Sequence, residues 1–343
     1  MPNTRGLSVH IGVVHVDPAH YQGWDGRLYA CEDDALAMQE LARECGFETT
    51  LLLTRDATRE NVIRAIERAA RELNEGDLFL LTYSGHGGQI PRPPDGRPAN
   101  LYDVESTDSL DETWCLHDAQ LLDDELNHLY RQFRTGVRIL LIQDACHSGF
   151  SDFDDRALLG AGASAGAAPE HGAAVEPAKR PARVDINAER GQEVEDASAV
   201  EPGQSSATPR PKAMPKARIN DTYEGNRRFY DEIRAVIPRP ADGSSFHETS
   251  PASILAICAC REHELAMEGP FNGYFTTALA MTWDEDSFSD YYEFYDLLAR
   301  RLSKISSAKQ TAEMYSCATD PKWITAQKTA KTVPWAKERP FQI

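Results

Sequence analysis

Two short segments decide the fold: residues 78–88 read LFLLTYSGHGG, and residues 137–149 read VRILLIQDACHSG. Each begins with a mostly apolar run, the pattern of a strand that is buried on both faces of a parallel sheet. Each run leads into small and polar residues that include His86 in the first segment and Cys146 in the second. Parallel strands carry functional groups at their carboxyl ends. If the two strands are neighbours, both side chains therefore emerge at one edge of the sheet.

Predicted strands and helices alternate along the rest of the chain. Hydrophobic periodicity predicts strands at residues 7–16, 48–53, 78–83, 137–142 and 253–258, and helices at residues 33–45, 58–74, 123–133, 221–236, 274–283 and 288–302. This order predicts an α/β fold with an open, mostly parallel sheet flanked by helices on both faces. Residues 155–219 lack aromatic side chains and are rich in Ala, Pro, Gly, Glu and Arg, so we expect a disordered linker. It separates a large unit at residues 1–154 from a small unit at residues 220–343.

Composition and charge exclude several classes of protein. The 343 residues include 36 Lys and Arg but 54 Asp and Glu, and the net charge of -18 disfavours nucleic acid and anionic membranes as partners. No apolar run approaches the length of a membrane span, and the apolar start of the chain carries two histidines, which indicates a first strand and not a signal peptide. Seven scattered cysteines indicate a reducing, cytoplasmic setting and not a disulfide-rich secreted domain.

A histidine beside a cysteine at a sheet edge is a base beside a nucleophile. A cysteine attacks carbonyl groups only as the thiolate, so it needs an imidazole nearby. Glycines flank His86, which lets a substrate backbone approach and leaves the Gly87 amide free to bind an oxyanion. Taken singly, such residues are more often a buried thiol and a structural histidine. A zinc site built from His86, Cys146 and His147 is the metal alternative, although no second thiol stands at ligand spacing.

The segments YSGHGG at residues 83–88 and DACHSG at residues 144–149 resemble the two catalytic segments of caspase-like cysteine peptidases, of the metacaspase and orthocaspase branch (peptidase C14 type). The order of His before Cys agrees with that family. The resemblance covers residues 7–153 and 253–317, and it implies a caspase-like fold in which the large and small units complete one domain. It further implies that Cys146 is the nucleophile, that His86 is the general base and acid, and that the amides of Gly87 and Cys146 form the oxyanion hole.

The resemblance also implies a substrate preference. The S1 pocket would be lined by the residues that match the family pattern: Cys31, Asp34, Ser84 and Asp144. A pair of carboxylates selects Arg or Lys at P1 through charge and hydrogen bonding. Without the resemblance, Asp34 would be interpreted as an acid that favours the N-terminus of the following helix. The expected partners are protein or peptide substrates with a basic P1 residue, and a monomer is the favoured state.

Calcium is the expected regulatory ion, again by the resemblance, and no organic cofactor is expected. Many metacaspases bind Ca²⁺ through acids, which here match Asp111, Asp123, Asp124 and, as the candidate for a fourth ligand, Asp152. Hard oxygen ligands in this number suit Ca²⁺ better than Zn²⁺. Acids at the start of a helix are otherwise an ordinary solvated first turn.

Basic residues in the linker are candidate self-cleavage sites, since caspase-like chains are commonly cut between their two units. The candidates are Lys179, Arg180, Arg183, Arg190 and Arg210. Without processing, the linker would be a passive spacer. The sequence thus predicts a cysteine endopeptidase that cleaves after Arg or Lys, is stimulated by Ca²⁺ and processes itself. The alternative is a catalytically silent caspase-like module that binds or regulates other proteins.

Overall fold

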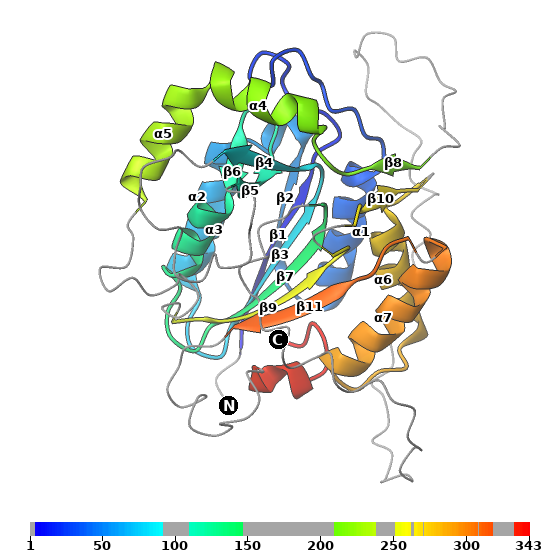
Figure 1. Ribbon diagram of the computed structural model, residues 1–343. Coiled ribbons are helices and arrows are strands. Elements are labelled where there is room, and N and C mark those ends of the chain that lie inside the picture. The colour runs from blue at the N-terminus through cyan, green and yellow to red at the C-terminus, as the bar shows by residue number, and fades with distance from the viewer. Residues whose placement is uncertain are drawn as a thin grey trace, which may run out of the picture. The chain divides into compact units, whose positions relative to one another are not determined.

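A computed structural model describes residues 4–91, 110–146, 209–237, 251–261, 264–269, 271–307, 309–317 and 333–343. Its main sheet has six strands in the order β11-β9-β7-β3-β1-β2 (Figure 1). These strands are β1 (Gly6–Gly12), β2 (Glu48–Leu53), β3 (Leu78–Ser84), β7 (Arg138–Asp144), β9 (Ser253–Cys258) and β11 (Glu313–Cys317). All neighbouring strands are parallel except β11, which runs antiparallel to β9. The predicted open, mostly parallel sheet is confirmed.

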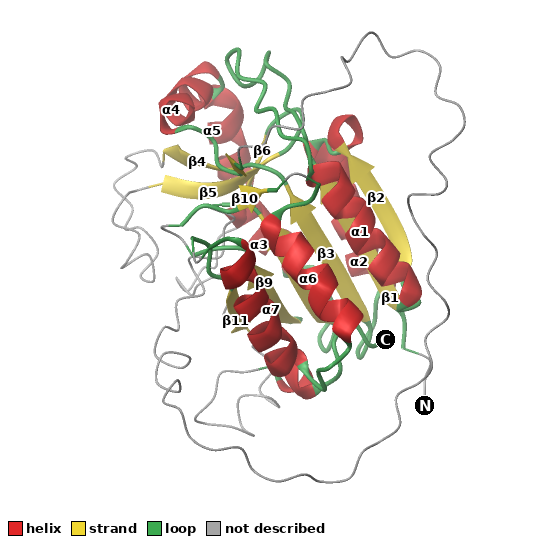
Figure 2. Ribbon diagram, turned by 90° about the vertical axis from the view of Figure 1, so that its right-hand side faces the viewer, coloured by secondary structure: helices red, strands yellow, loops and turns green. Residues whose placement is uncertain are grey.

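Helices cover both faces of this sheet (Figure 2). On one face lie α1 (Cys31–Glu44), α6 (Tyr274–Glu285) and α7 (Tyr291–Ile305), and on the other lie α2 (Arg59–Glu72) and α3 (Asp123–Tyr130). Successive strand residues point to opposite faces, so Leu80 packs in the core under α1 and α6, while Leu81 packs in the core under α2 and α3. Among the described residues, no helix is long and apolar enough to cross a lipid bilayer.

A second, antiparallel sheet follows β3 at the carboxyl ends of the main strands (Figure 1). Its three strands are β4 (Gly87–Pro91), β5 (Leu110–Cys115) and β6 (Gln120–Leu122). Helices α4 (Lys216–Gly225) and α5 (Arg227–Val236) pack on it through a small apolar cluster that includes Ile90, Leu122, Tyr230 and Ile233. This sheet was not predicted from the sequence.

The structure differs from the predicted linker at its C-terminal end. The sequence predicts a linker through residue 219, but residues 209–219 contain strand β8 (Arg210–Pro211), which pairs with β10 (Met267–Glu268), and the first residues of α4. Their low apolar content suggested disorder, yet Met214 is buried in the main core. The predicted helix at residues 221–236 is two helices, because the chain breaks between α4 and α5. The described residues before and after the linker belong to one compact unit. Short 3₁₀ helices occur at Thr54–Asp56 and Pro334–Lys337.

A buried histidine in β1 makes the fold sensitive to acid. The ring nitrogens of His10 lie 3.0 Å from Thr82 Oγ1 and 2.8 Å from Ser8 Oγ, and burial lowers the pKa of His10 from 6.5 to about 3. The unfolded chain takes up a proton at this residue as the pH falls below 6.5, while the folded chain does not until the pH reaches about 3. We therefore expect the free energy of unfolding to fall across this window, by about 2 kcal/mol from His10 alone between pH 7 and pH 5.

Urea unfolding at pH 7 and pH 5 measures this loss. The control is His10→Gln, which keeps a hydrogen-bonding side chain but cannot titrate. Its loss of stability between the two pH values should be smaller than that of the wild type by about 2 kcal/mol. An equal loss in both proteins would show that His10 does not set the acid sensitivity.

Candidate active site

The two motif strands are neighbours in the sheet. β3 and β7 pair in parallel, with Ser84 opposite Asp144, so the residues that follow the two strands leave from the same edge. His86 and Cys146 each come two residues later, and both side chains are buried. The structure thus brings the predicted base and the predicted nucleophile to one end of the sheet.

His86 is oriented by a carbonyl group and an aromatic ring. Its Nε2 lies 2.9 Å from the carbonyl oxygen of Gly26, and its ring packs on Trp24 with the centroids 4.9 Å apart. A carbonyl oxygen can only accept a hydrogen bond, so in the neutral ring Nε2 carries the proton and Nδ1 keeps a lone pair. Burial lowers the pKa of His86 from 6.5 to about 4. The imidazole is therefore neutral at pH 7, and Nδ1 can accept a proton.

Tyr83 fixes the turn that carries His86. The Tyr83 hydroxyl donates to the His86 carbonyl oxygen at 2.7 Å, and the Tyr83 ring stacks on Trp114 with the centroids 4.5 Å apart. A Cβ atom on Gly85 would lie 2.5 Å from the Tyr83 hydroxyl, so this glycine is required by the packing of the turn. The sequence alone had suggested that the same glycine makes room for a substrate.

Cys146 follows β7 with its thiol inside the fold. The backbone N–H of Ala266 donates to Cys146 Sγ at 2.9 Å. The Cys146 thiol in turn donates to the Ala266 carbonyl oxygen at 3.6 Å. A second thiol, that of Cys260, is a neighbour: its hydrogen bond with Cys146, together with burial, holds the pKa of Cys260 well above the usual range. Cys260 therefore stays protonated beside Cys146.

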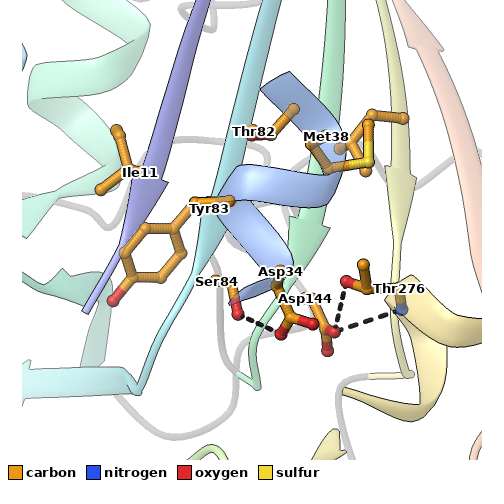
Figure 3. Close-up of a pocket in the computed structure, with 10 residues that line it drawn as sticks. Ile11, Asp34, Met38, Thr82, Tyr83, Ser84, Asp144 and Thr276 are labelled. Carbon is orange, nitrogen blue, oxygen red and sulfur yellow. Dashed lines mark hydrogen bonds between the residues drawn. The ribbon is translucent and has the colours of Figure 1, made fainter. Parts of the chain in front are cut away.

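The residues predicted to line S1 lie together below the ends of β3 and β7, where Figure 3 shows three of them. Cys31 and Asp34 belong to the first turn of α1, Ser84 ends β3, and Asp144 ends β7. All four are buried. The Ser84 hydroxyl donates to Asp34 Oδ2 at 2.7 Å, and the Thr276 hydroxyl of α6 donates to Asp144 Oδ2 at 2.9 Å. Burial raises the pKa of Cys31 to about 12, so its thiol is neutral.

The acidic pocket contains a lysine of the chain itself. Lys212 Nζ lies 2.8 Å from Asp34 Oδ2, 3.0 Å from Asp144 Oδ2 and 2.9 Å from Ser84 Oγ, and the side chain is fully buried. Burial alone would lower the pKa of Lys212, but Asp144 and Asp34 outweigh it and hold this pKa well above its usual range. The pocket thus binds a charged ammonium group through two carboxylates and one hydroxyl.

The backbone of Lys212 is bound at the two motif segments. The N–H groups of Gly87 and Cys146 donate to the Lys212 carbonyl oxygen at 3.0 and 3.2 Å. These are the two amides that the resemblance assigns to the oxyanion hole. The Lys212 N–H donates to the Ala266 carbonyl oxygen at 2.8 Å. A backbone hydrogen bond with the next residue, Ala213, acts to raise the pKa of His86. Burial has the stronger effect, so the net shift of this pKa is downward.

Arg210, predicted as a self-cleavage candidate, lies outside the acidic pocket. It opposes Glu268 in the β8–β10 pair, its guanidinium lies 4.4 Å from the centroid of the Tyr29 ring, and it donates to the Arg27 carbonyl oxygen. The pocket is filled by Lys212, two residues further along the chain. The other candidates are outside the described residues: Lys179, Arg180, Arg183 and Arg190.

Helix α6 and the turn before it supply site residues that could not be identified from the sequence. A Cβ atom on Gly273 would lie 2.0 Å from Asp144 Oδ2 and 2.5 Å from Lys212 Nζ, so only glycine leaves room for a bound lysine. The Gly273 N–H donates to Asp34 Oδ1 at 2.9 Å, as does the Asn272 side chain. The available signal was the stretch GPFNGY at residues 269–274, directly before a predicted helix. Glycine and asparagine are common in turns of every kind, so this stretch does not by itself indicate a site.

The predicted Ca²⁺ ligands are not gathered in the described residues. Asp111 pairs with Arg234 of α5, whose Nη2 lies 2.6 Å from Asp111 Oδ2, and both side chains are buried. Asp123 and Asp124 begin α3, and Asp152 is outside the described residues. Within the part of the chain that is described, no group of three or more His, Cys, Asp or Glu side chains could hold a metal ion. Binding of Ca²⁺ and stimulation by it stay predictions.

The ion pair between Arg234 and Asp111 should stabilise the packing of α5 on the small sheet. Arg234→Ala leaves the buried Asp111 without this guanidinium, and removal of one partner of a buried pair costs about 3 kcal/mol or more. Urea unfolding should show this loss. The control is Arg228→Ala on the exposed side of the same helix, where the pair with Glu232 is in solvent and no loss is expected. Similar stabilities for the two variants would contradict a stabilising role of the buried pair.

Comparison with known proteins gives three findings. The family model described as the caspase domain matches residues 13–323. Metacaspase-1A of Aspergillus fumigatus is 34% identical over 145 residues, which cover 38% of this chain and 33% of that protein. Metacaspase-1 of Mycosarcoma maydis is 34% identical over 140 residues, which cover 38% of this chain and 34% of that protein. The chain thus spans about a third of the length of these curated relatives. The crystal structure of protein GSU0716 from Geobacter sulfurreducens has a TM-score of 0.69 and 32% identity, with 99% of each chain covered.

Proposed function

The chain belongs to the caspase domain family, as the resemblance predicted, and from this premise we propose that it is a cysteine endopeptidase that cleaves after lysine or arginine. One observation carries the proposal. A single lysine residue reaches both the acidic pocket, with its ammonium group, and the amides of Gly87 and Cys146, with its carbonyl oxygen. The pocket and the amide pair are therefore separated by the length of one basic residue.

The reaction begins with proton transfer from the Cys146 thiol to Nδ1 of His86. The sulfur then attacks the P1 carbonyl carbon, and the carbonyl π electrons move onto the oxygen. The N–H groups of Gly87 and Cys146 already point at this oxygen and stabilise its negative charge. Protonated His86 next donates its proton to the leaving amine as the C–N bond breaks, which leaves an acyl-enzyme. His86 finally takes a proton from a water molecule, and the resulting hydroxide releases the acid product and restores the thiol.

The S1 pocket supplies the preference for a basic residue. Asp34 and Asp144 both contact the bound ammonium, and donors from β3, from the turn before α6 and from α6 keep the two carboxylates in place. An arginine side chain offers more donors in a planar fork, which suits two carboxylates as well. A P1 aspartate would bring a third negative charge into a buried site that already holds two. Protein or peptide substrates with a basic P1 residue are the partners that this proposal requires.

Three fluorogenic peptides test the proposal, each with Arg, Lys or Asp at P1. The purified protein, incubated beforehand so that any self-cleavage is complete, should release the fluorophore from the first two only. Iodoacetamide should stop the release, because it alkylates the attacking thiolate. Failure to cleave any of the three peptides would instead support the catalytically silent module. Parallel assays in excess Ca²⁺ and in EGTA decide whether calcium stimulates the enzyme.

A further inference from the structure

We propose that Cys146 and Cys260 form a reversible disulfide bond in the presence of a peroxide, and that this bond inactivates the peptidase while it protects the nucleophile from permanent oxidation. The bond is a modification of two thiols and does not itself depend on catalysis. Its effect on activity rests on the proposed function, since it uses the same nucleophile. Cys260 takes no part in peptide cleavage in this inference.

The fold places the two cysteines on neighbouring parts of the chain. β7 and β9 are adjacent parallel strands (Figure 1). Cys146 comes two residues after the end of β7, and Cys260 comes two residues after the end of β9. Neighbouring strands lie about 4.8 Å apart, and a disulfide joins residues whose Cα atoms are about 4.4 to 6.8 Å apart. The spacing of the two strands therefore suits a disulfide between the residues that follow them.

Both sulfur atoms lie against the same short stretch of backbone. Cys260 Sγ is 3.7 Å from the Glu264 carbonyl oxygen and 3.8 Å from the carbonyl oxygen of Ala145, the residue directly before Cys146. Cys146 Sγ is 2.9 Å from the backbone nitrogen of Ala266, two residues after Glu264. A hydrogen bond joins the two thiols. Each sulfur thus has the other as a neighbour in the reduced protein.

The direction of the side chains distinguishes Cys260 from the other cysteine of this segment, Cys258. Cys146 and Cys260 both pack in the core under α1 and α6. Cys258 packs in the core under α2 and α3, on the other face of the sheet. The Cys31 thiol belongs to the acidic pocket at the start of α1. Cys260 is therefore the thiol that the fold places against the nucleophile.

Side chains from beyond α7 hold the loop that carries Cys260. Gln310 Nε2 donates to the Ala259 carbonyl oxygen at 2.9 Å, and the Thr311 N–H donates to a carboxylate oxygen of Glu264 at 2.7 Å. Reactants that are held in place react as parts of one molecule and gain a large rate advantage. Disulfide formation can therefore compete with further oxidation of Cys146.

Oxidation by hydrogen peroxide takes two steps. The Cys146 sulfur, deprotonated by His86, attacks one peroxide oxygen, the O–O bond breaks, and a sulfenic acid and one water molecule result. The Cys260 sulfur then attacks the sulfenic sulfur, the S–O bond breaks, and the departing hydroxide leaves as water with the Cys260 proton. The two thiols lose two electrons, which the peroxide gains. Without Cys260, a second peroxide converts the sulfenic acid to a sulfinic acid, and this step is irreversible.

The disulfide removes the attacking atom but leaves a route for its return. A sulfur that is bonded to Cys260 cannot attack a carbonyl carbon, so peptide cleavage stops. Cys260 keeps 8% of its surface exposed, whereas Cys146 is fully buried. A reducing thiol from solution therefore reaches the Cys260 sulfur more readily, and its attack there releases Cys146. Disulfides in reducing compartments are typically transient and redox-sensing in this way.

Peptide mapping without reductant tests the inference on the full chain. Reduced wild-type protein, treated with a small excess of hydrogen peroxide, should yield one linked pair of peptides that contains Cys146 and Cys260. Turnover of the Arg peptide should fall at least about tenfold and should return to most of its starting value after dithiothreitol. Linkage of Cys146 to another cysteine, or no linkage at all, would overturn the inference.

Cys260→Ala removes the second thiol, and Cys258→Ala is the matched control on the same segment. After peroxide and then dithiothreitol, Cys260→Ala should recover less than about a tenth of its turnover and carry a sulfinic acid at Cys146. Cys258→Ala should recover as the wild type does. Cys260→Ser, with a side chain of similar size, repeats the test if Cys260→Ala does not fold.

The outcomes separate this inference from the proposed function. Equal recovery of the wild type and Cys260→Ala would overturn the protective role of Cys260 and leave the proposed function standing. If the reduced wild-type protein cleaves no peptide, the proposed function fails. The linked pair of peptides then decides by itself whether the disulfide forms.

Discussion

Cys146→Ala should abolish peptide hydrolysis, with a loss of about a thousandfold or more. The sulfur is the attacking atom, and alanine offers no group that could replace it. His86→Ala should be nearly as severe, because the variant loses the base that takes the thiol proton. Turnover of a fluorogenic Arg peptide measures both effects, and melting temperatures show whether the variants keep the fold.

Cys260→Ala is the matched control for the nucleophile. It removes a thiol that is buried beside Cys146 and hydrogen-bonded to it, but that lies outside the amide pair. This variant should retain most of the turnover. If Cys260→Ala were inactive and Cys146→Ala active, Cys260 and not Cys146 would be the nucleophile. Substantial activity in either Cys146→Ala or His86→Ala would refute the mechanism.

Discrimination at P1 should be the second large effect. An Arg or Lys peptide should be cleaved with a kcat/KM at least about a thousandfold above that of the Asp peptide, because a P1 carboxylate would be buried without a partner. Asp34→Asn removes one of the two charges that face the ammonium and should lower kcat/KM for the Arg peptide at least tenfold, or about 1.4 kcal/mol. The same substitution should reduce the preference for Arg over neutral Gln at P1.

The ratio of kcat/KM for the Arg peptide to kcat/KM for the Gln peptide separates a role of Asp34 in substrate recognition from a role in folding. A merely structural Asp34 would lower the rates for Arg and Gln peptides together and leave their ratio unchanged. Asp33→Asn is the matched control, since it makes the same change at the neighbouring, half-buried position of α1. An equal change of this ratio in Asp33→Asn would indicate that the preference for Arg depends on negative charge at the start of α1, and not on a carboxylate inside the pocket.

The main sheet could be predicted because its strands carry their own signal. Strands buried on both faces form short apolar runs, and the predictions at residues 48–53 and 253–258 coincide with β2 and β9. The small sheet carries no such signal. Its strand β6 has three residues, and β4 and β5 pair across a long separation in sequence. Their pairing depends on tertiary packing under α4 and α5, which local patterns do not contain.

The candidate active site also contains some residues that could be predicted from the sequence and others that could not. His86 and Cys146 follow strong strands within short, specific segments, so both the residues and their proximity could be predicted. The position of Lys212 in the acidic pocket could not be predicted, because Lys212 is one of several basic residues in a stretch of uniform composition. Its partners Asp34 and Ser84 are 178 and 128 residues away in sequence.

The main sheet continues across the segment that contains the predicted self-cleavage sites. β7 precedes that segment and β9 follows it, yet the two strands pair in parallel from Arg138 and Ser253 to Gln143 and Cys258. A chain cut at one of these sites would therefore remain assembled as a complex of two fragments that share one core. Unfolding of that complex yields two molecules instead of one, so its melting temperature should rise with protein concentration. The intact chain should melt at the same temperature at every concentration.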